Sequence, residues 1–303
     1  YDAWDIGMIT TDTHMGSEPL ASAPKSIQTS IKKIKGVPVI TGFIGRTASG
    51  KITTLGRGGS DYTTAIIGGA IQAEEIQIWK EVDGVLSTDP RIVPNAKLIP
   101  ELHYEEASEL AYFGAKVLHP KTMLPAMMKS VPIRVVNTFK PSGKGTRISG
   151  NIPPNKKGVA KAVSATKGTT VVTLHSPDFF DGSGLMAQIF TVFEKHTIPV
   201  DVISTSVVSV STSYASSYHS EELVADLSKI GRVRVDKQCA VVCVVGAGMN
   251  NAKVIRDACD VFDKKRIPVR MISESASGIS VTFLVQESDA KKSVIALHKA
   301  LIK

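Results

Sequence analysis

The sequence has few cysteines, few aromatic residues and no long apolar run. Its 303 residues include three cysteines, an odd number too small for a disulfide framework. Cys239 and Cys243 stand four apart in a valine-rich run, which predicts thiols buried on one face of a strand in a reducing compartment. No apolar run approaches the ~20 residues that span a bilayer. Two aspartates precede any apolar stretch, which is not the pattern of a signal peptide.

The charge is positive but diffuse. Lys and Arg number 36 against 28 Asp and Glu, for a net charge of +8. The lysines stand in small groups, and the aromatic residues, at 6%, do not interleave with them. We therefore expect no nucleic-acid partner. His and Cys residues at zinc-ligand spacing are also lacking, so no metal site is predicted. An apolar content of 43% is that of a globular protein, and the length predicts two or three domains.

The first 150 residues alternate between predicted strands and helices. Residues 37–43 (VPVITGF) form a continuous apolar run, typical of a strand buried in a parallel sheet. The run 60–73 predicts a helix that begins with Ser60 as its N-cap. Such alternation favours a layered α/β domain. Strands are also expected at 51–55, 75–80 and 131–139, and helices at 25–35, 104–113 and 121–129, the last interrupted by Pro125.

An internal repeat follows a linker rich in Gly, Pro and Lys. Residues 192–206 (VFEKHTIPVDVISTS) align without gaps to residues 261–275 (VFDKKRIPVRMISES), with nine of fifteen positions identical. Around each copy, the pattern reads strand, helix, strand, strand, helix. This order predicts a β-α-β-β-α unit of about seventy residues that occurs twice, as a paired module.

Two glycine-rich loops in the first part could bind anions. Gly45 to Lys51 has the GxxxxGK spacing of a phosphate-binding loop, but Ile52 follows where Ser or Thr is needed, so a surface hairpin is favoured. Residues 56–61 (GRGGSD) expose backbone amides at a strand-to-helix turn, and Arg57 offers a planar fork for a carboxylate or phosphate. The alternative is a plain glycine turn in which Asp61 neutralises Arg57.

Two further loops complete the candidate site. Residues 79–91 (WKEVDGVLSTDPR) follow a strand, and the carboxyl edge of an α/β sheet is where ligands bind. A plain surface loop is the equal alternative. In residues 113–120 (FGAKVLHP), Lys116 could reach a phosphate, whereas His119 precedes a proline and is expected to cap a helix rather than act as a base.

Together these four stretches resemble the amino-acid kinase family, specifically aspartate kinases. The stretches TTLGRGGSDYT, VDGVLSTDPR and ELAYFGAKVLHP look like its signatures in order and spacing, and the repeat looks like its paired ACT domains. Within this family, the sequence is most similar to the plant-type, monofunctional, lysine-sensitive enzymes. The resemblance implies the C-terminal part of an amino-acid-kinase-like α/β sandwich followed by two ferredoxin-like βαββαβ ACT domains. The expected boundaries are 1–150 for the kinase part, 151–158 for the linker, 159–236 for the first ACT domain and 237–303 for the second, whose C-terminal segment could complete the first.

The implied reaction is transfer of the ATP γ-phosphoryl group to the β-carboxylate of L-aspartate, with ATP bound as its Mg²⁺ complex and no prosthetic group. The product would supply lysine, threonine and methionine synthesis. By resemblance, Arg57, Asp61 and Lys116 are catalytic. Residues of the GRGGSD turn would hold aspartate: Arg57, Gly58, Gly59 and Ser60. The ATP site would comprise Lys80, Glu81, Leu86, Arg91, Lys116 and Val117.

The first repeat unit is implied to bind the effector lysine, with S-adenosylmethionine and threonine as alternatives. The residues implied are Phe179, Gly182, Leu185, Met186, Val200, Asp201 and Ser206. Arg270 stands in the second copy where Asp201 stands in the first, so the second copy should not bind a cationic amino acid in the same way. Paired ACT domains also imply a homodimer or larger assembly, soluble and intracellular, in the cytoplasm or, for a plant-type enzyme, the plastid stroma.

The family also begins with a Lys-Phe-Gly-Gly loop for ATP phosphates and carries an acidic residue that contacts aspartate, neither of which is found here. We therefore expect the chain to begin midway through the kinase domain and to be inactive alone. The rival hypothesis, from another class, is an amino-acid-sensing ACT protein whose partial kinase domain is not catalytic. A third is a kinase for glutamate, acetylglutamate or uridine monophosphate.

Overall fold

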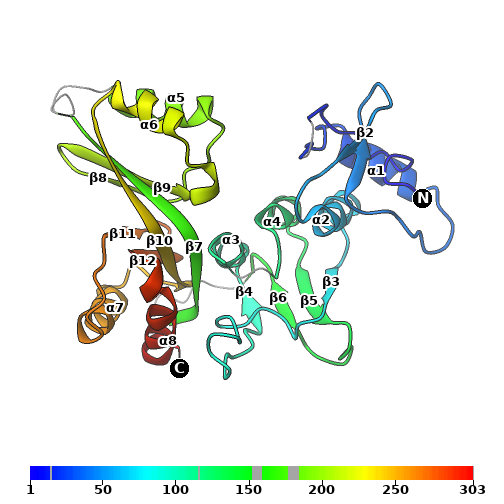
Figure 1. Ribbon diagram of the computed structural model, residues 1–303. Helices are drawn as coiled ribbons and strands as arrows, with labels where there is room; N and C mark the ends of the chain where they lie inside the picture. Colours follow the sequence, from blue (N-terminus) through cyan, green and yellow to red (C-terminus); the bar gives the residue numbers. More distant parts are fainter. Residues whose placement is uncertain (14–15, 115–116, 152–158, 177–183, 303) are drawn as a thin grey trace. The chain divides into compact units, whose positions relative to one another are not determined.

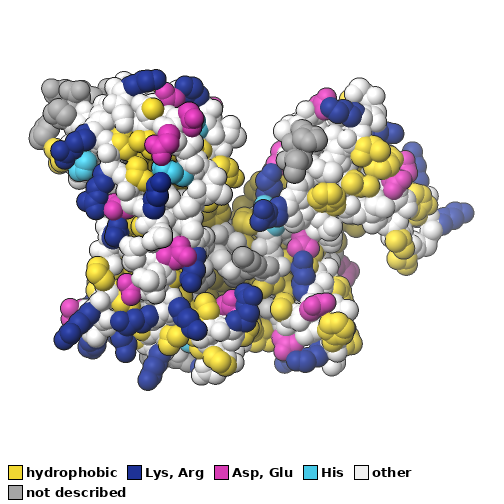
Figure 2. All heavy atoms as spheres, in the orientation of Figure 1, with side chains coloured by type: hydrophobic (Ala, Val, Ile, Leu, Met, Phe, Trp, Pro, Cys, Tyr) yellow, Lys and Arg dark blue, Asp and Glu magenta, His cyan; other side chains and the backbone are white. Residues whose placement is uncertain are grey.

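The computed structural model describes the chain except residues 14–15, 115–116, 152–158, 177–183 and 303. Its contacts divide it into two compact units (Figure 1). The first unit contains residues 1–90 and 94–155, and the second contains 91–93 and 156–303. On the face drawn in Figure 2, Lys and Arg side chains are interspersed with Asp and Glu, in keeping with a diffuse positive charge.

The first unit is an α/β unit with a four-stranded sheet and a two-stranded hairpin. The sheet has the order β3-β5-β6-β4; β3 and β5 are parallel, as are β4 and β6, while β5 and β6 are antiparallel. The strands are β1 (Ile44–Arg46), β2 (Ile52–Thr54), β3 (Ile76–Lys80), β4 (Glu101–Leu102), β5 (Ile133–Asn137) and β6 (Thr146–Ile148). The helices are α1 (Ala23–Ile31), α2 (Gly59–Ile71), α3 (Tyr104–Tyr112), the 3-10 turn η1 (Pro120–Thr122) and α4 (Met123–Met128).

Two local predictions for this unit are wrong. Residues 37–43 form no strand; Val37 and Val39 are 93% and 81% exposed, and the segment lies against the backbone of Tyr1 instead. Pro38 lacks the N–H that a sheet ladder needs. Ser60 does not cap α2, which begins one residue earlier with Gly58 at the N-cap and no side-chain cap. The expected hairpin at residues 45–51 is confirmed, since β1 and β2 pair in antiparallel register.

The second unit is one six-stranded antiparallel sheet with order β11-β12-β10-β7-β9-β8. Its strands are β7 (Val159–His175), β8 (Ile203–Thr205), β9 (Ser209–Ala215), β10 (Arg232–Ala247), β11 (Met271–Glu274) and β12 (Ser280–Gln286). Its helices are α5 (Leu185–Lys195), α6 (Glu221–Ser228), α7 (Ala252–Lys264) and α8 (Ala290–Leu301), with 3-10 turns η3 (Ser216–Tyr218) and η4 (Glu287–Asp289). Cys239 and Cys243 are both buried in β10, as predicted.

Both repeat copies share the two long strands, β7 and β10. The second half of β7 and the start of β10 complete the first copy, beside β9 and β8. The first half of β7 is the outer neighbour of β10 in the second copy, beside β12 and β11. Each copy therefore has the ferredoxin-like four-stranded sheet covered by two helices, and residues that precede the first copy complete the second. The division expected at residue 236 stays a prediction, although a register shift between Asp236 and Cys239 falls there.

Candidate functional site

The GRGGSD turn links the end of β2 to the first turn of α2. Gly58 has φ +69° and Gly56 has φ +77°, a left-handed backbone that glycine adopts without steric cost. The close approach of neighbouring side chains also requires glycine at these positions. A Cβ on Gly58 would lie 2.4 Å from the Cβ of His119, and one on Gly59 would lie 2.7 Å from the Phe43 ring. The turn is therefore packed between two other loops of the same unit.

Asp61 pairs with Lys80 and not with Arg57. The Lys80 Nζ donates to both carboxylate oxygens of Asp61, at 2.9 and 3.0 Å, and the Asp61 side chain is only 15% exposed. This contact joins the first turn of α2 to the end of β3. The alternative in which Asp61 neutralises Arg57 is wrong, because Lys80 already occupies both oxygens.

Arg57 is exposed, and within the described part of the chain its guanidinium has no hydrogen bond or ion pair. Its charge reaches His119, whose pKa is lowered mainly by burial and further by the charges of Lys121 and Arg57. The imidazole is therefore neutral near pH 7. His119 Nδ1 accepts a hydrogen bond from the Lys121 N–H, which confirms its expected role as the cap of η1. The turn thus carries one unpaired cation beside a neutral ring.

The loop after β3 is fastened to β5. Asp83 accepts hydrogen bonds from the Asn137 side chain at 2.6 Å and from Lys140 at 2.9 Å. The bond from Lys140 is the main cause that holds the pKa of Asp83 below its ordinary value. Leu86 forms an isolated bridge with Leu98, and its side chain is half-buried. The carboxyl ends of two parallel strands therefore meet here, next to Lys80, as the sequence predicts for a ligand site.

Not every predicted residue is brought to this turn. Arg57, Asp61 and Lys80 lie at the turn, whereas Glu81 is exposed, one residue beyond Lys80.

Arg91 belongs to the second unit, where its neighbour Ile92 packs on the second repeat's core, so its nucleotide contact stays a prediction. Val117 is half-buried two residues before His119, and Lys116 lies outside the described residues.

Two features of the site were not predicted from the sequence. Phe43 has φ +74°, rare for a residue with a side chain, and donates its N–H to Thr63 of α2 at 3.0 Å. Glu18 accepts a hydrogen bond from Tyr62 of α2 and pairs with Lys121 of η1. Burial, followed by this contact with Glu18, holds the pKa of Tyr62 well above its usual range. The unusual backbone at Phe43 could have been suggested only by the pair Gly42-Phe43 after an apolar run. No local sequence signal marks the contacts of Glu18.

The predicted effector residues lie at the start of α5 and around β8. Leu185 is buried, and Met186 and Val200 are half-buried. Asp201 donates its backbone N–H to Ser213 at 2.8 Å, and Ser206 Oγ lies 2.7 Å from Ser209 Oγ. Phe179 and Gly182 lie outside the described residues.

Arg270 stands in the second copy at the position of Asp201 in the first. Its guanidinium binds Asp236 and Gln286, both at 2.9 Å. This position is therefore filled by contacts internal to the chain, and the prediction that it should not bind a cationic amino acid stays a prediction.

The described residues contain no group of three or more His, Cys, Asp or Glu side chains placed to hold a metal ion. Likewise, none of the described helices is long and apolar enough to cross a membrane.

Comparison with known proteins assigns a family to each unit. Residues 9–137 match the amino acid kinase family and residues 242–301 match an ACT domain. Aspartokinase 1, chloroplastic, of Arabidopsis thaliana is 38% identical over 317 residues, covering 100% of this chain and 56% of the relative. The chain therefore spans little more than half the length of this relative.

Solved structures lead to the same family assignment. E. coli aspartokinase III in complex with aspartate and ADP has a TM-score of 0.86 at 33% identity, covering 100% of this chain and 69% of that one. Clostridium acetobutylicum aspartate kinase has a TM-score of 0.83 at 26% identity, covering 99% and 70%. These likenesses extend over both units, and the expected fold class is confirmed. The chain belongs to the aspartate kinase family.

Proposed function

We propose that the protein transfers the γ-phosphoryl group of ATP to the β-carboxylate of L-aspartate, and that Arg57 clamps a carboxylate of the acceptor. The observation that carries the proposal is the Arg57 guanidinium, which is unpaired among the described residues, on a turn of backbone amides beside a neutral His119, with Asp61 already neutralised by Lys80. An acidic acceptor would meet a net positive charge there. E. coli aspartokinase III, which shares this fold, was solved with aspartate and ADP.

The chemistry fits a site without a general base. A side-chain carboxylate has a reference pKa of ~3.9, so the acceptor is already ionised at neutral pH. What remains is to position two anions in line and to offset their charge. The neutral, capping imidazole of His119 takes no proton in this scheme. ATP would enter with Mg²⁺ as its counter-ion, as part of the substrate.

The nucleotide is proposed to bind along the edge where β3 and β5 end. Lys80, Glu81 and Leu86 follow this edge, and Val117 stands on the loop that leads to His119. Lys80 would serve two purposes, since its ammonium keeps one donor beyond the two that it gives to Asp61. The nucleotide contacts of Lys116 and Arg91 stay predictions from the sequence, because Lys116 lies outside the described residues and Arg91 belongs to the other unit.

The test is a coupled ADP-release assay on the full-length protein, with and without L-aspartate. Arg57→Ala should raise the KM for aspartate by about tenfold or more, the size of losing a charge-assisted hydrogen bond, with the KM for ATP little changed. The matched control is Lys51→Ala, which removes an exposed cation of the hairpin that pairs with Asp12. Absence of aspartate-dependent turnover in the wild type would favour the sensor hypothesis, and equal loss of both affinities would refute the role of Arg57.

Lysine regulation is proposed for the first repeat copy. An effector ammonium would pair with Asp201, and its carboxylate would meet the backbone amides at the start of α5. The internally filled position of Arg270 supports a single effector site per chain. Calorimetry with lysine, threonine and S-adenosylmethionine should then give one lysine per chain, and Asp201→Asn should abolish that heat. Two sites per chain would contradict the assignment.

A homodimer through the second unit is also proposed. The edge strands β8 and β11 expose equivalent apolar residues, with Ile203 40% and Ile272 44% exposed, and Val207 beside them is 63% exposed. The strands β8 and β11 also contact each other, and exposed apolar residues that lie close together are typical of a protein interface. Ile203→Lys should shift the sedimentation coefficient toward that of a monomer, whereas a wild type that already sediments as a monomer would refute the proposal.

A further inference from the structure

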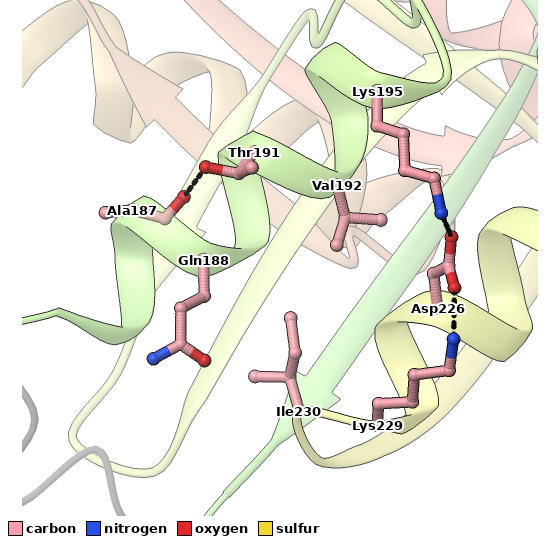
Figure 3. Close-up of a pocket in the computed structure, with 8 residues that line it drawn as sticks. All are labelled: Ala187, Gln188, Thr191, Val192, Lys195, Asp226, Lys229 and Ile230. Atoms are coloured by element: carbon pink, nitrogen blue, oxygen red, sulfur yellow. Dashed lines mark hydrogen bonds and ion pairs between the residues drawn. The ribbon is translucent and has the colours of Figure 1, made fainter.

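A groove on the helix layer of the first repeat copy has no part in the functions proposed above. It lies between α5 and α6, is open to solvent, and has a volume of about 410 Å³, within the usual range for small-molecule sites. The side chains of Gln188, Val192 and Ile230 point into the space between the helices (Figure 3). Val192 and Ile230 are partly buried against the core of this copy. The floor of the groove is therefore the apolar edge of that core.

One end of the groove is charged, and its charge is positive. Asp226 accepts hydrogen bonds from Lys195 and Lys229, both at 2.6 Å, and lies 3.0 Å from His196 Nε2 (Figure 3). The bonds from Lys195, Lys229 and His196, in that order, hold the pKa of Asp226 far below its usual range, so it is a carboxylate at any ordinary pH. Two ammonium groups thus share one carboxylate. Each keeps two N–H donors, and both are mostly exposed.

The second repeat copy provides an internal comparison, at an offset of 69 residues. Where α5 has Ala187, Gln188 and Thr191, α7 has Arg256, Asp257 and Asp260. Two of these charges are paired on the helix itself, because Asp257 pairs with Lys253 and Arg256. On α5, Thr191 turns back to the carbonyl of Ala187 at 2.8 Å. The same fold therefore tolerates a charged outer face, and the uncharged face of α5 is not a structural necessity.

We propose that this groove binds a small amphipathic monocarboxylate, with a branched or aromatic apolar body over Val192 and Ile230 and its carboxylate at Lys195 and Lys229. The positive charge favours an anionic head group, since the ammonium groups of Lys195 and Lys229 each keep N–H donors beyond the one given to Asp226. The Gln188 amide stands beside the path of the body and can bind a second polar group of the ligand.

The inference goes beyond the proposed kinase and lysine site, yet it connects to them through one helix. α5 begins with Leu185 and Met186, which are among the proposed effector residues, and continues directly into the groove with Ala187 and Gln188. A ligand with its carboxylate at Lys195 would contact the C-terminal end of α5, three turns from the effector residues at its start. Binding is nevertheless measurable without catalysis, so failure of the kinase proposal leaves this one testable.

The experiment titrates the full chain, labelled at Ile and Val methyl groups, with 4-methylpentanoate and with its neutral analogue 4-methylpentanamide. We expect saturable shifts at Val192 and Ile230 for the acid, and an affinity for the amide at least about tenfold lower. Ala187→Arg places in α5 the residue that α7 carries, on an exposed position, and should abolish binding. Its matched control is Arg256→Ala in the second copy, which should leave the titration unchanged.

Several results would overturn the proposal. The acid could fail to shift the groove methyls; the amide could bind as well as the acid, which would remove the role of the lysines; or Ala187→Arg could bind like the wild type. Sedimentation of Ala187→Arg tests the remaining alternative, in which a second copy of the chain occupies the groove. If this variant changes the oligomeric state while the wild type binds no acid, the groove is an interface with a second copy and the proposal is wrong. The double variant Lys195→Gln/Lys229→Gln, checked by circular dichroism for folding, must also lose the acid.

Discussion

Replacing Gly58 with alanine separates the two reasons for a glycine in the GRGGSD turn. Gly58 has φ +69°, where an L-residue costs about 1 kcal/mol, and a Cβ there would lie 2.4 Å from the Cβ of His119. Moving His119 aside resembles overpacking a well-packed core, which costs ~1–3 kcal/mol. The expected loss of unfolding free energy is therefore about 2–4 kcal/mol.

Gly36 provides the matched control within the same unit. It has φ +84°, and a Cβ there would meet nothing within 4 Å, so Gly36→Ala should lose only the backbone part, about 1 kcal/mol. Both tryptophans, Trp4 and Trp79, lie in the first unit, so their fluorescence during urea unfolding follows that unit alone. Equal losses for the two variants would refute the reasoning, because they would show that the approach of His119 carries no energy.

Three further outcomes are expected. His119 has a lowered pKa, so the unfolded chain takes up a proton first as pH falls below about 6.5; the urea midpoint of the first unit should fall there, and less so in His119→Gln. Asp226 has a lowered pKa, so its contribution is present above its ordinary pKa of 3.8 and lost only in stronger acid; Asp226→Asn should lower the melting temperature of the second unit at pH 7, with no such difference in strong acid, by circular dichroism. Arg270→Ala should cost about 1 kcal/mol or less, and a larger loss would show that its contacts with Asp236 and Gln286 are more than an exposed pair.

Much of the fold could be predicted because the signals are local. The apolar spacing of residues 25–35 is realised in α1, whose Ile27 is fully buried. The predicted strand at 75–80 and helix at 104–113 agree with β3 and α3 within a residue. The strand predicted at 37–43 failed because an apolar run is compatible with several structures, and Pro38 and the neighbouring Tyr1 decided among them.

Most of the element order, the repeat and the turn that carries Arg57 could be predicted from the amino-acid sequence, because hydrophobic periodicity and glycine placement act over a few residues. Packing between distant elements had to be seen to learn that Lys80 rather than Arg57 neutralises Asp61, that Glu18 joins Tyr62 to Lys121, and that β7 serves both repeat copies. These contacts join residues 19 to 103 positions apart. Their formation depends on how whole elements pack, which no local pattern encodes.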